Sequence, residues 1–302
     1  VYEEYNIGLS SDWRKVYAAL FAKLFPTHPY GTQTTIGLGE HLKNPSITNI
    51  KNYFNKYYVP NNIAICLSGD LDPDKTVASI EKYFGNWKPS AHIDVPQFPA
   101  QPALTAPVDT TVVGKEAPML FMGWRADASK SLQLDTLEVI AQLLSNGQAG
   151  LFDLDLSQKL KVQEVSAGIA DMDEYSVFYV YGQPKSGQTL QEVRSLALSE
   201  IEKLKKGNFS DDLLPSIVNN YKRYYYTQLD NNQFRAKQYV DAFINHKDWK
   251  QEVDKLNRIS KLTKAEIVKF ANQFFHNDFA CVYKEQGNDT TIKKVEKPTI
   301  TP

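Results

Sequence analysis

The sequence predicts an α+β protein built from two homologous units, each an antiparallel sheet with helices packed on one face. Three observations predict it. A helix–strand segment occurs twice in the chain, the second copy mixes alternating strand patterns with amphipathic helices, and a proline-rich stretch separates the two copies. The length of 302 residues also suits two domains.

The repeat is clearest in one helix and the strand that follows it. The first copy runs over 46–58 and continues over 59–66, and the second runs over 263–275 and continues over 276–282. Both copies begin with a residue suited to a helix N-cap, Ser46 or Thr263. Apolar residues then recur at helical spacing, a pair of aromatic residues ends the helix, and each copy is expected to run into a strand.

The position of the two copies predicts that the first unit is shortened. About 155 residues, 108–262, lie between the proline-rich stretch and the second copy, whereas 45 residues precede the first copy. If the units are true copies, the first unit lacks its front part. The missing part would account for the difference in the number of residues before the two copies of the helix. The predicted boundaries are 1–95 for the back half of a first domain, 96–107 for a linker, 108–287 for a complete second domain, and 288–302 for a linker to a missing downstream part.

The second unit carries the pattern of a sheet mixed with helices. Alternating or continuous apolar runs predict its strands, and apolar residues at helical spacing predict its helices. The expected strands cover 110–113, 119–124, 165–170 and 177–181, and the expected helices cover 132–144, 151–160, 189–205, 211–230 and 234–243.

Composition excludes several classes of protein. With 34 basic and 35 acidic residues the net charge is −1, so nothing indicates a nucleic-acid partner. No apolar run is long enough to span a membrane, and no signal peptide is recognisable. The compartment stays open, a periplasmic or other extracytoplasmic one included. Cys66 and Cys281 each lie in an apolar run, which favours two buried thiols over a disulfide or a ligand pair.

Local patterns give no complete metal site. The five histidines, none of which has a partner four residues away on a helix, are His28, His41, His92, His246 and His276. Glu3 and Glu4 are adjacent on an expected helix and point in different directions, so by pattern alone they are surface charges.

Two turns have an ordinary interpretation as well as a functional one. The segment 27–31, Thr-His-Pro-Tyr-Gly, follows an apolar helix and is predicted to be structural. The glycine-containing segment 145–150 has the composition of a phosphate-binding loop but lacks a following Lys-Ser or Lys-Thr. It is therefore predicted to connect two helices.

Taken together and in order, several segments resemble the M16 metallopeptidase family, the insulinase and pitrilysin group. They are Val-Tyr-Glu-Glu at 1–4, His-Pro-Tyr-Gly at 28–31, Tyr-Tyr-Val-Pro-Asn-Asn at 57–62, Ser-Gly-Asp at 68–70, and the stretch from Leu143 to Phe152. The resemblance covers nearly the whole chain. It implies a protein built from homologous α+β domains, which agrees with the repeat.

The resemblance also implies a zinc site that this chain holds only in part. The family binds zinc through a His-x-x-Glu-His helix and a later Glu, which corresponds to Glu4 here, with Glu3 as the near alternative. The His-x-x-Glu-His helix would fall in the missing front part of the first unit, and its Glu would take the proton from zinc-bound water. The implied cofactor is zinc in the intact parent, with none bound by this chain, which holds no catalytic residue.

In the second unit the resemblance implies a non-catalytic domain. The family steadies the substrate carbonyl with an Arg and a Tyr seven residues apart, and Ser157 and Glu164 stand in the corresponding places. The implied function is that of one portion of a zinc-dependent endopeptidase that cleaves peptides or unfolded polypeptides in an enclosed chamber. Its partners would be that substrate, the missing N-terminal segment and a second M16 half, in the same chain or in another subunit.

Two alternatives stay open. The first is a non-catalytic relative that serves as a structural or assembly subunit, in which Glu4 would be a surface charge. The second is a peptide-binding module that captures extended chains at a sheet edge. The sequence upstream of Val1 separates the first alternative from the peptidase, and peptide binding without cleavage would favour the second.

Overall fold

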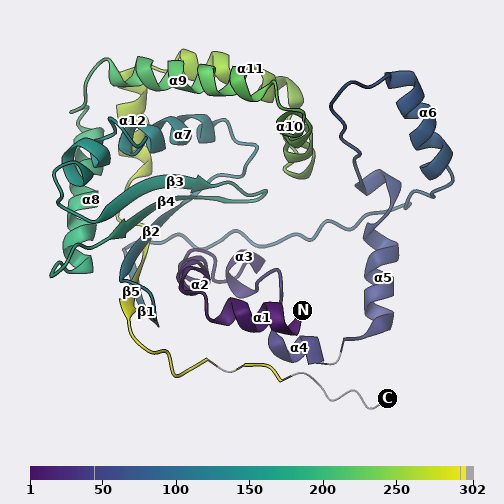
Figure 1. Cartoon of the computed structure of the whole chain (residues 1–302), viewed down its shortest axis with the longest axis horizontal. Coiled ribbons are helices and arrows are strands. Elements are labelled where there is room, and N and C mark those ends of the chain that lie inside the picture. The colour runs from purple at the N-terminus through teal and green to yellow at the C-terminus, as the bar shows by residue number, and fades with distance from the viewer. Residues whose placement is uncertain (44, 293, 297–302) are drawn as a thin grey trace.

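A computed structural model describes residues 1–43, 45–292 and 294–296, and Figure 1 shows the chain as helices gathered around one sheet. Residues 297–302 of the predicted C-terminal linker lie outside the described part. The strands are β1 (Val108–Gly114), β2 (Met119–Ala126), β3 (Glu164–Ala170), β4 (Ser176–Gln183) and β5 (Ala280–Gln286). The helices are α1 (Tyr2–Leu9), α2 (Asp12–Leu24), α3 (Pro29–Thr32), α4 (Gly39–Lys43), α5 (Ile47–Tyr57), η1 (Pro60–Asn62), α6 (Pro73–Phe84), α7 (Gln133–Leu144), η2 (Asp153–Ser157), α8 (Leu190–Lys205), α9 (Leu213–Gln228), α10 (Asn232–Ile244), α11 (Trp249–Ser260) and α12 (Lys264–Phe274).

The five strands form one sheet in the order β1-β5-β2-β4-β3. The predicted α+β class is confirmed. The pairs β2–β4, β2–β5 and β3–β4 are antiparallel as predicted, whereas β1 and β5 run parallel, with Val108 opposite Ala280. A parallel pair needs a long crossover between its strands. Here the whole helical part of the second unit separates β1 from β5, which permits that pairing.

One face of the sheet carries the main hydrophobic core. Figure 1 shows α7, α9 and α11 above the sheet and α8 beside it. Fully buried residues of these helices and of α12, including Ile140, Val193 and Ile267, pack with Trp124 and Phe178 of the strands. A Thr189–Glu192 capping box begins α8, and a Thr263–Glu266 capping box begins α12.

The opposite face of the sheet is covered by α2. The prediction placed helices on one face only, and in this respect it was incomplete. Val16, Leu20 and Leu24 are buried along one side of α2 and pack with strand residues that include Phe121 and Val282. Strand β2 is apolar on both faces, so its second face also needs a cover. That cover comes from a helix of the first unit.

The first unit contains helices α1 to α6 and no strand among its described residues. The strand predicted after α5 does not form, because residues 63–66 are extended but pair with no described strand. Cys66 is accordingly half-buried, not buried as predicted. In Figure 1, α5 and α6 stand apart from the rest of the molecule.

Two helical predictions in the second unit need correction. The helix expected over 151–160 is mainly the π-helical turn η2, in which the Asp153 carboxylate bonds back to the preceding loop. Helix α11 was not predicted. Its apolar residues Trp249, Val253, Leu256 and Ile259 recur at helical spacing, so the signal was present in the sequence.

Neither predicted linker contains a helix or a strand in the described residues. Residues 96–107 cross beneath the sheet in extended form, and Gln101 is buried on the way. Residues 288–292 and 294–296 lie against the first unit, where Asp289 pairs with Lys15 at 2.7 Å and Val295 is buried. Both segments therefore pack against the folded chain.

Candidate functional site

The residue predicted as a metal ligand, Glu4, lies in the first turn of α1. Glu3 precedes it, and both side chains are exposed. Neither carboxylate makes a hydrogen bond or an ion pair within the part of the chain that the structure describes. A negative charge is favourable at this position because the helix dipole is positive at its N-terminal end. Both carboxylates are thus available to a group outside these residues.

Helix α1 is held in place although it has no buried residue of its own. The Asn6 side chain bonds the backbone of Val295 twice, donating to the carbonyl at 2.9 Å and accepting from the N–H at 2.9 Å. The hydroxyl of Tyr2 donates to the carbonyl of Leu42 at the end of α4. These contacts fix the helix that carries Glu4 between α4 and the C-terminal segment.

Glu4 does not form a metal site with other residues of this chain. Within 1–43, 45–292 and 294–296, no three His, Cys, Asp or Glu side chains lie close enough together to hold a metal ion. The histidines are dispersed: His92 pairs with Asp94 at 2.6 Å and His246 with Asp173 at 3.1 Å. One carboxylate without imidazole partners does not meet the three protein ligands that a catalytic zinc ion requires.

The ends of α1 and α9 offer an alignment between the helix that carries Glu4 and the second unit. Helix α1 ends at Leu9 and α9 ends at Gln228. When these two helix ends are aligned, Tyr2 corresponds to Tyr221, and the pair Glu3-Glu4 corresponds to Lys222-Arg223. The second unit therefore carries two cations where the first carries two carboxylates, and these positions cannot bind a metal cation.

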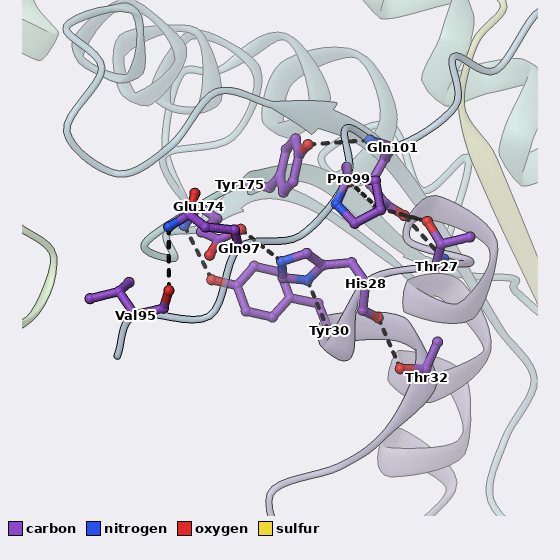
Figure 2. Close-up of polar contacts among 10 residues, drawn as sticks. All are labelled: Thr27, His28, Tyr30, Thr32, Val95, Gln97, Pro99, Gln101, Glu174 and Tyr175. Carbon is purple, nitrogen blue, oxygen red and sulfur yellow. Dashed lines mark hydrogen bonds and ion pairs between the residues drawn. The ribbon is translucent and has the colours of Figure 1, made fainter. Parts of the chain in front are cut away.

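The turn at 27–31 ties the first unit to the second, as Figure 2 shows. Buried His28 accepts the N–H of Tyr30 at Nδ1 (3.1 Å), so its ring proton lies on Nε2, which is 2.9 Å from the Glu174 carboxylate in the β3–β4 loop. Gln101 lies in the extended segment 96–107. Its side-chain oxygen accepts a hydrogen bond from the Thr27 hydroxyl, and its backbone N–H donates to the hydroxyl of Tyr175. The predicted structural role of this turn is confirmed.

The glycine-containing loop 145–150 has no free anion site. One carboxylate oxygen of Asp153 accepts the backbone N–H groups of Asn146, Gln148 and Gly150 at 2.9, 3.2 and 2.9 Å. The side chain of Asn146 accepts a further N–H from Ala149. Because these donors already bind a carboxylate, the loop cannot cradle a phosphate, and its prediction as a connection between helices is confirmed.

The two positions compared with the family's carbonyl-binding Arg and Tyr lie at the edge of the sheet. Ser157 is the last residue of η2, and Glu164 is the first residue of β3 and is exposed. Neither side chain is positively charged, so this pair cannot donate to a substrate carbonyl as an Arg does.

A buried ion pair, which was not predicted from the sequence, joins the two units. Lys284 Nζ of β5 lies 2.8 Å from Asp12 Oδ2 at the start of α2, and both side chains are almost fully buried. The same carboxylate oxygen accepts the N–H of Glu116 at 2.7 Å. Burial by itself raises the pKa of Asp12, but the bonds from Lys284 and Glu116 outweigh it and lower that pKa. No sequence pattern marks partners so far apart in the chain.

Comparison with known proteins identifies the class to which this architecture belongs. The model of the M16 peptidase inactive domain matches residues 46–221, which is more than half of the chain. The chain belongs to the M16 peptidase family. The match covers the end of the first unit, the extended segment 96–107 and the larger part of the second unit.

Individual relatives are longer than this chain. The zinc protease PqqE of Helicobacter pylori is 24% identical over 269 residues, which are 86% of this chain and 59% of that protein. The chain thus spans about three fifths of that relative. The structure of a protease from Helicobacter pylori matches 94% of this chain and 70% of its own, with a TM-score of 0.86 at 21% identity.

A third similarity concerns a protein with two halves. The periplasmic protease PqqL of Escherichia coli matches 94% of this chain but 33% of its own, with a TM-score of 0.77 at 12% identity. A structure of the first half of the same protease matches over 64% of its length, with a TM-score of 0.76. At these identities the likeness shows the fold.

Proposed function

We propose that this chain is the part of a zinc-dependent M16 endopeptidase that supplies the third metal ligand, Glu4, and the complete non-catalytic second domain. The remaining ligands would come from a His-x-x-Glu-His helix in a segment that precedes Val1. The single observation that carries the proposal is the state of Glu4: it is exposed and without a partner in the described residues, on a helix that other contacts hold in place.

Three further observations support this assignment. Lys222 and Arg223 occupy the corresponding positions of the second unit, as expected of a domain without metal. The Helicobacter pylori relative that matches 86% of this chain is called a zinc protease and is longer than this chain. The likeness to part of a two-half protease supports a second M16 half as a partner. The substrate would be a peptide or unfolded polypeptide enclosed between the halves.

The test is the metal content of the longer natural protein that includes an upstream segment. We expect one tightly bound zinc per chain, measured by atomic emission after dialysis, and peptidase activity on a quenched fluorescent peptide. Glu4→Gln should lower zinc affinity at least about tenfold and remove activity, because the amide carries no charge. Glu3→Gln is the matched control and should keep both.

Two results would contradict the proposal. If Glu4→Gln leaves the zinc content and turnover unchanged, Glu4 is not the ligand. If the longer protein binds no zinc and cleaves no peptide, the chain belongs to a structural or peptide-binding relative, and Glu4 is a surface charge.

A further inference from the structure

Helix α1 has a packed side and an exposed side, and Glu4 lies on the exposed one. The half-buried side chains of the helix recur at helical spacing and are Tyr2, Tyr5, Asn6 and Leu9. Glu4 is two residues away from both Tyr2 and Asn6, so its side chain points to the opposite side of the helix. The contacts that hold the packed side therefore fix the direction in which the Glu4 carboxylate points.

The packed side of α1 is bound by the segment that follows β5. This C-terminal segment, residues 288–292 and 294–296, passes beneath α1 in the view of Figure 1. The Asn6 carboxamide bonds Val295 twice, since Nδ2 donates to the backbone carbonyl and Oδ1 accepts the backbone N–H, both at 2.9 Å. A carboxamide offers a donor and an acceptor side by side, which matches the two backbone groups of one extended residue.

Close packing holds Val295 in this place. Val295 is 8% exposed, and it lies against Gly39, the first residue of α4. A methyl group at Gly39 would overlap the Val295 side chain and press on the ring of Tyr5, so α1, α4 and the C-terminal segment meet without room for a side chain. Nearer β5, the same segment is held by the ion pair of Asp289 with Lys15 at 2.7 Å. The segment is thus fixed at two separate places.

We propose that Asn6 is a positioning residue for the metal ligand Glu4, and that the C-terminal segment sets the zinc affinity of the first unit through it. The inference rests on the proposed function, because it takes Glu4 as a ligand. A ligand whose direction is already fixed loses less conformational freedom when it binds. Groups that orient a metal ligand in this way change metal affinity by about 10- to 100-fold.

The experiment measures zinc affinity in the longer natural protein with its upstream segment, by competition with a chromophoric chelator. Asn6→Leu is similar in size to the native side chain but removes both bonds to Val295. It should weaken zinc binding at least about tenfold. Thr189→Ala, which removes the cap of α8, is the matched control: it should also lower the melting temperature by about 2–5 °C, yet leave the zinc affinity unchanged.

A second variant tests the same contact without a change in α1. Gly39→Ala should displace Val295 and weaken zinc binding in the same direction. Both variants can also be studied in this chain, where no metal is needed. The amide hydrogen exchange of α1 should become at least about fivefold faster in each, while that of α7 should stay the same, because only α1 loses its contact with the C-terminal segment.

The outcomes separate this inference from the proposed function. If Glu4→Gln lowers the zinc affinity but Asn6→Leu does not, Asn6 has a structural role only, and the proposed function stands. Unchanged exchange of α1 in both variants would also overturn the inference, because the contact would then not hold the helix. A longer protein that binds no zinc refutes the proposed function, and with it the role of Asn6 toward zinc.

Discussion

Two regions of this molecule have related sequences, but one is buried and the other is exposed to solvent. Helix α12 and β5 lie in the core of the second unit, where Ile267 and Cys281 are fully buried. Helix α5 and segment 63–67 repeat the same pattern in the first unit, yet Ile50 is 54% exposed and Ile65 is 48% exposed. Both helices have a Ser or Thr cap that accepts a backbone N–H three residues on.

The comparison shows which features are local and which depend on partners. Caps and helical periodicity act within the segment, so both copies form the helix. A strand needs a neighbouring strand for its backbone hydrogen bonds, and segment 63–67 has none among the described residues. The same pattern therefore gives a buried strand in one unit and an extended, exposed segment in the other.

The largest difference between the two regions should appear in the reactivity of their thiols. Burial raises the pKa of Cys281 to about 12, so its thiolate is scarce and inaccessible, whereas Cys66 is half-exposed. A disulfide-exchange reagent at pH 8 should label one thiol per native chain within minutes and two after denaturation. Cys66→Ser should abolish the rapid reaction. Rapid labelling of two thiols in the native chain would mean that β5 is not buried as described.

The next largest effect concerns Lys284 of β5 and Ser68, which directly follows segment 63–67. Lys284→Met should destabilise the chain by about 3–5 kcal/mol, because it leaves the buried carboxylate of Asp12 unpaired. Ser68→Ala should cost less than about 1 kcal/mol in this chain, since it removes one hydrogen bond from Arg235. Urea unfolding measures both.

A double variant separates charge burial from packing at this position. Asp12→Asn with Lys284→Met should recover a large part of the stability that Lys284→Met loses, because no buried charge remains. If the double variant is no more stable than Lys284→Met, the loss comes from packing, and the ion pair does not explain it.

A smaller effect is expected from truncating corresponding residues of the two helices. Ile267→Ala should cost about 2–5 kcal/mol, because it leaves a cavity beside the sheet. Ile50→Ala should change the stability of this chain by less than about 0.5 kcal/mol, because its side chain already faces solvent. Equal losses in the two variants would show that α5 is packed in solution and would contradict its exposure here.

Much of the secondary structure was predictable because its causes are local. Alternation and cap residues indicated β3, β4 and α8 to within a few residues. The turn at 27–31 was also predictable as a structural element, but its partner Glu174 was not, since that contact joins residues 146 apart. Helix α11 was missed although its periodic apolar residues could have revealed it.

The candidate site, like the fold, was predictable only in part. The sequence indicated Glu4 through its resemblance to a family motif, and it indicated the absence of a complete histidine motif directly. The replacement of the carboxylates by Lys222 and Arg223 became visible only when the ends of α1 and α9 fixed the alignment between the units. The reason is that the two helices share few residue types and are related here only by where they end.

By itself the sequence indicated most helices and strands, because capping, periodicity and turn residues act over a few positions. It indicated the family through its resemblance to known motifs, and the division into two homologous units stays a prediction. Only the tertiary structure decided that α2 packs on the second unit, that Asp12 pairs with Lys284, and that segment 63–67 pairs with no strand of the described residues. These outcomes depend on which surfaces are present to be covered. The burial of apolar area is not directional. An apolar helix face in the sequence therefore predicts that another surface packs on it, but it does not identify that surface.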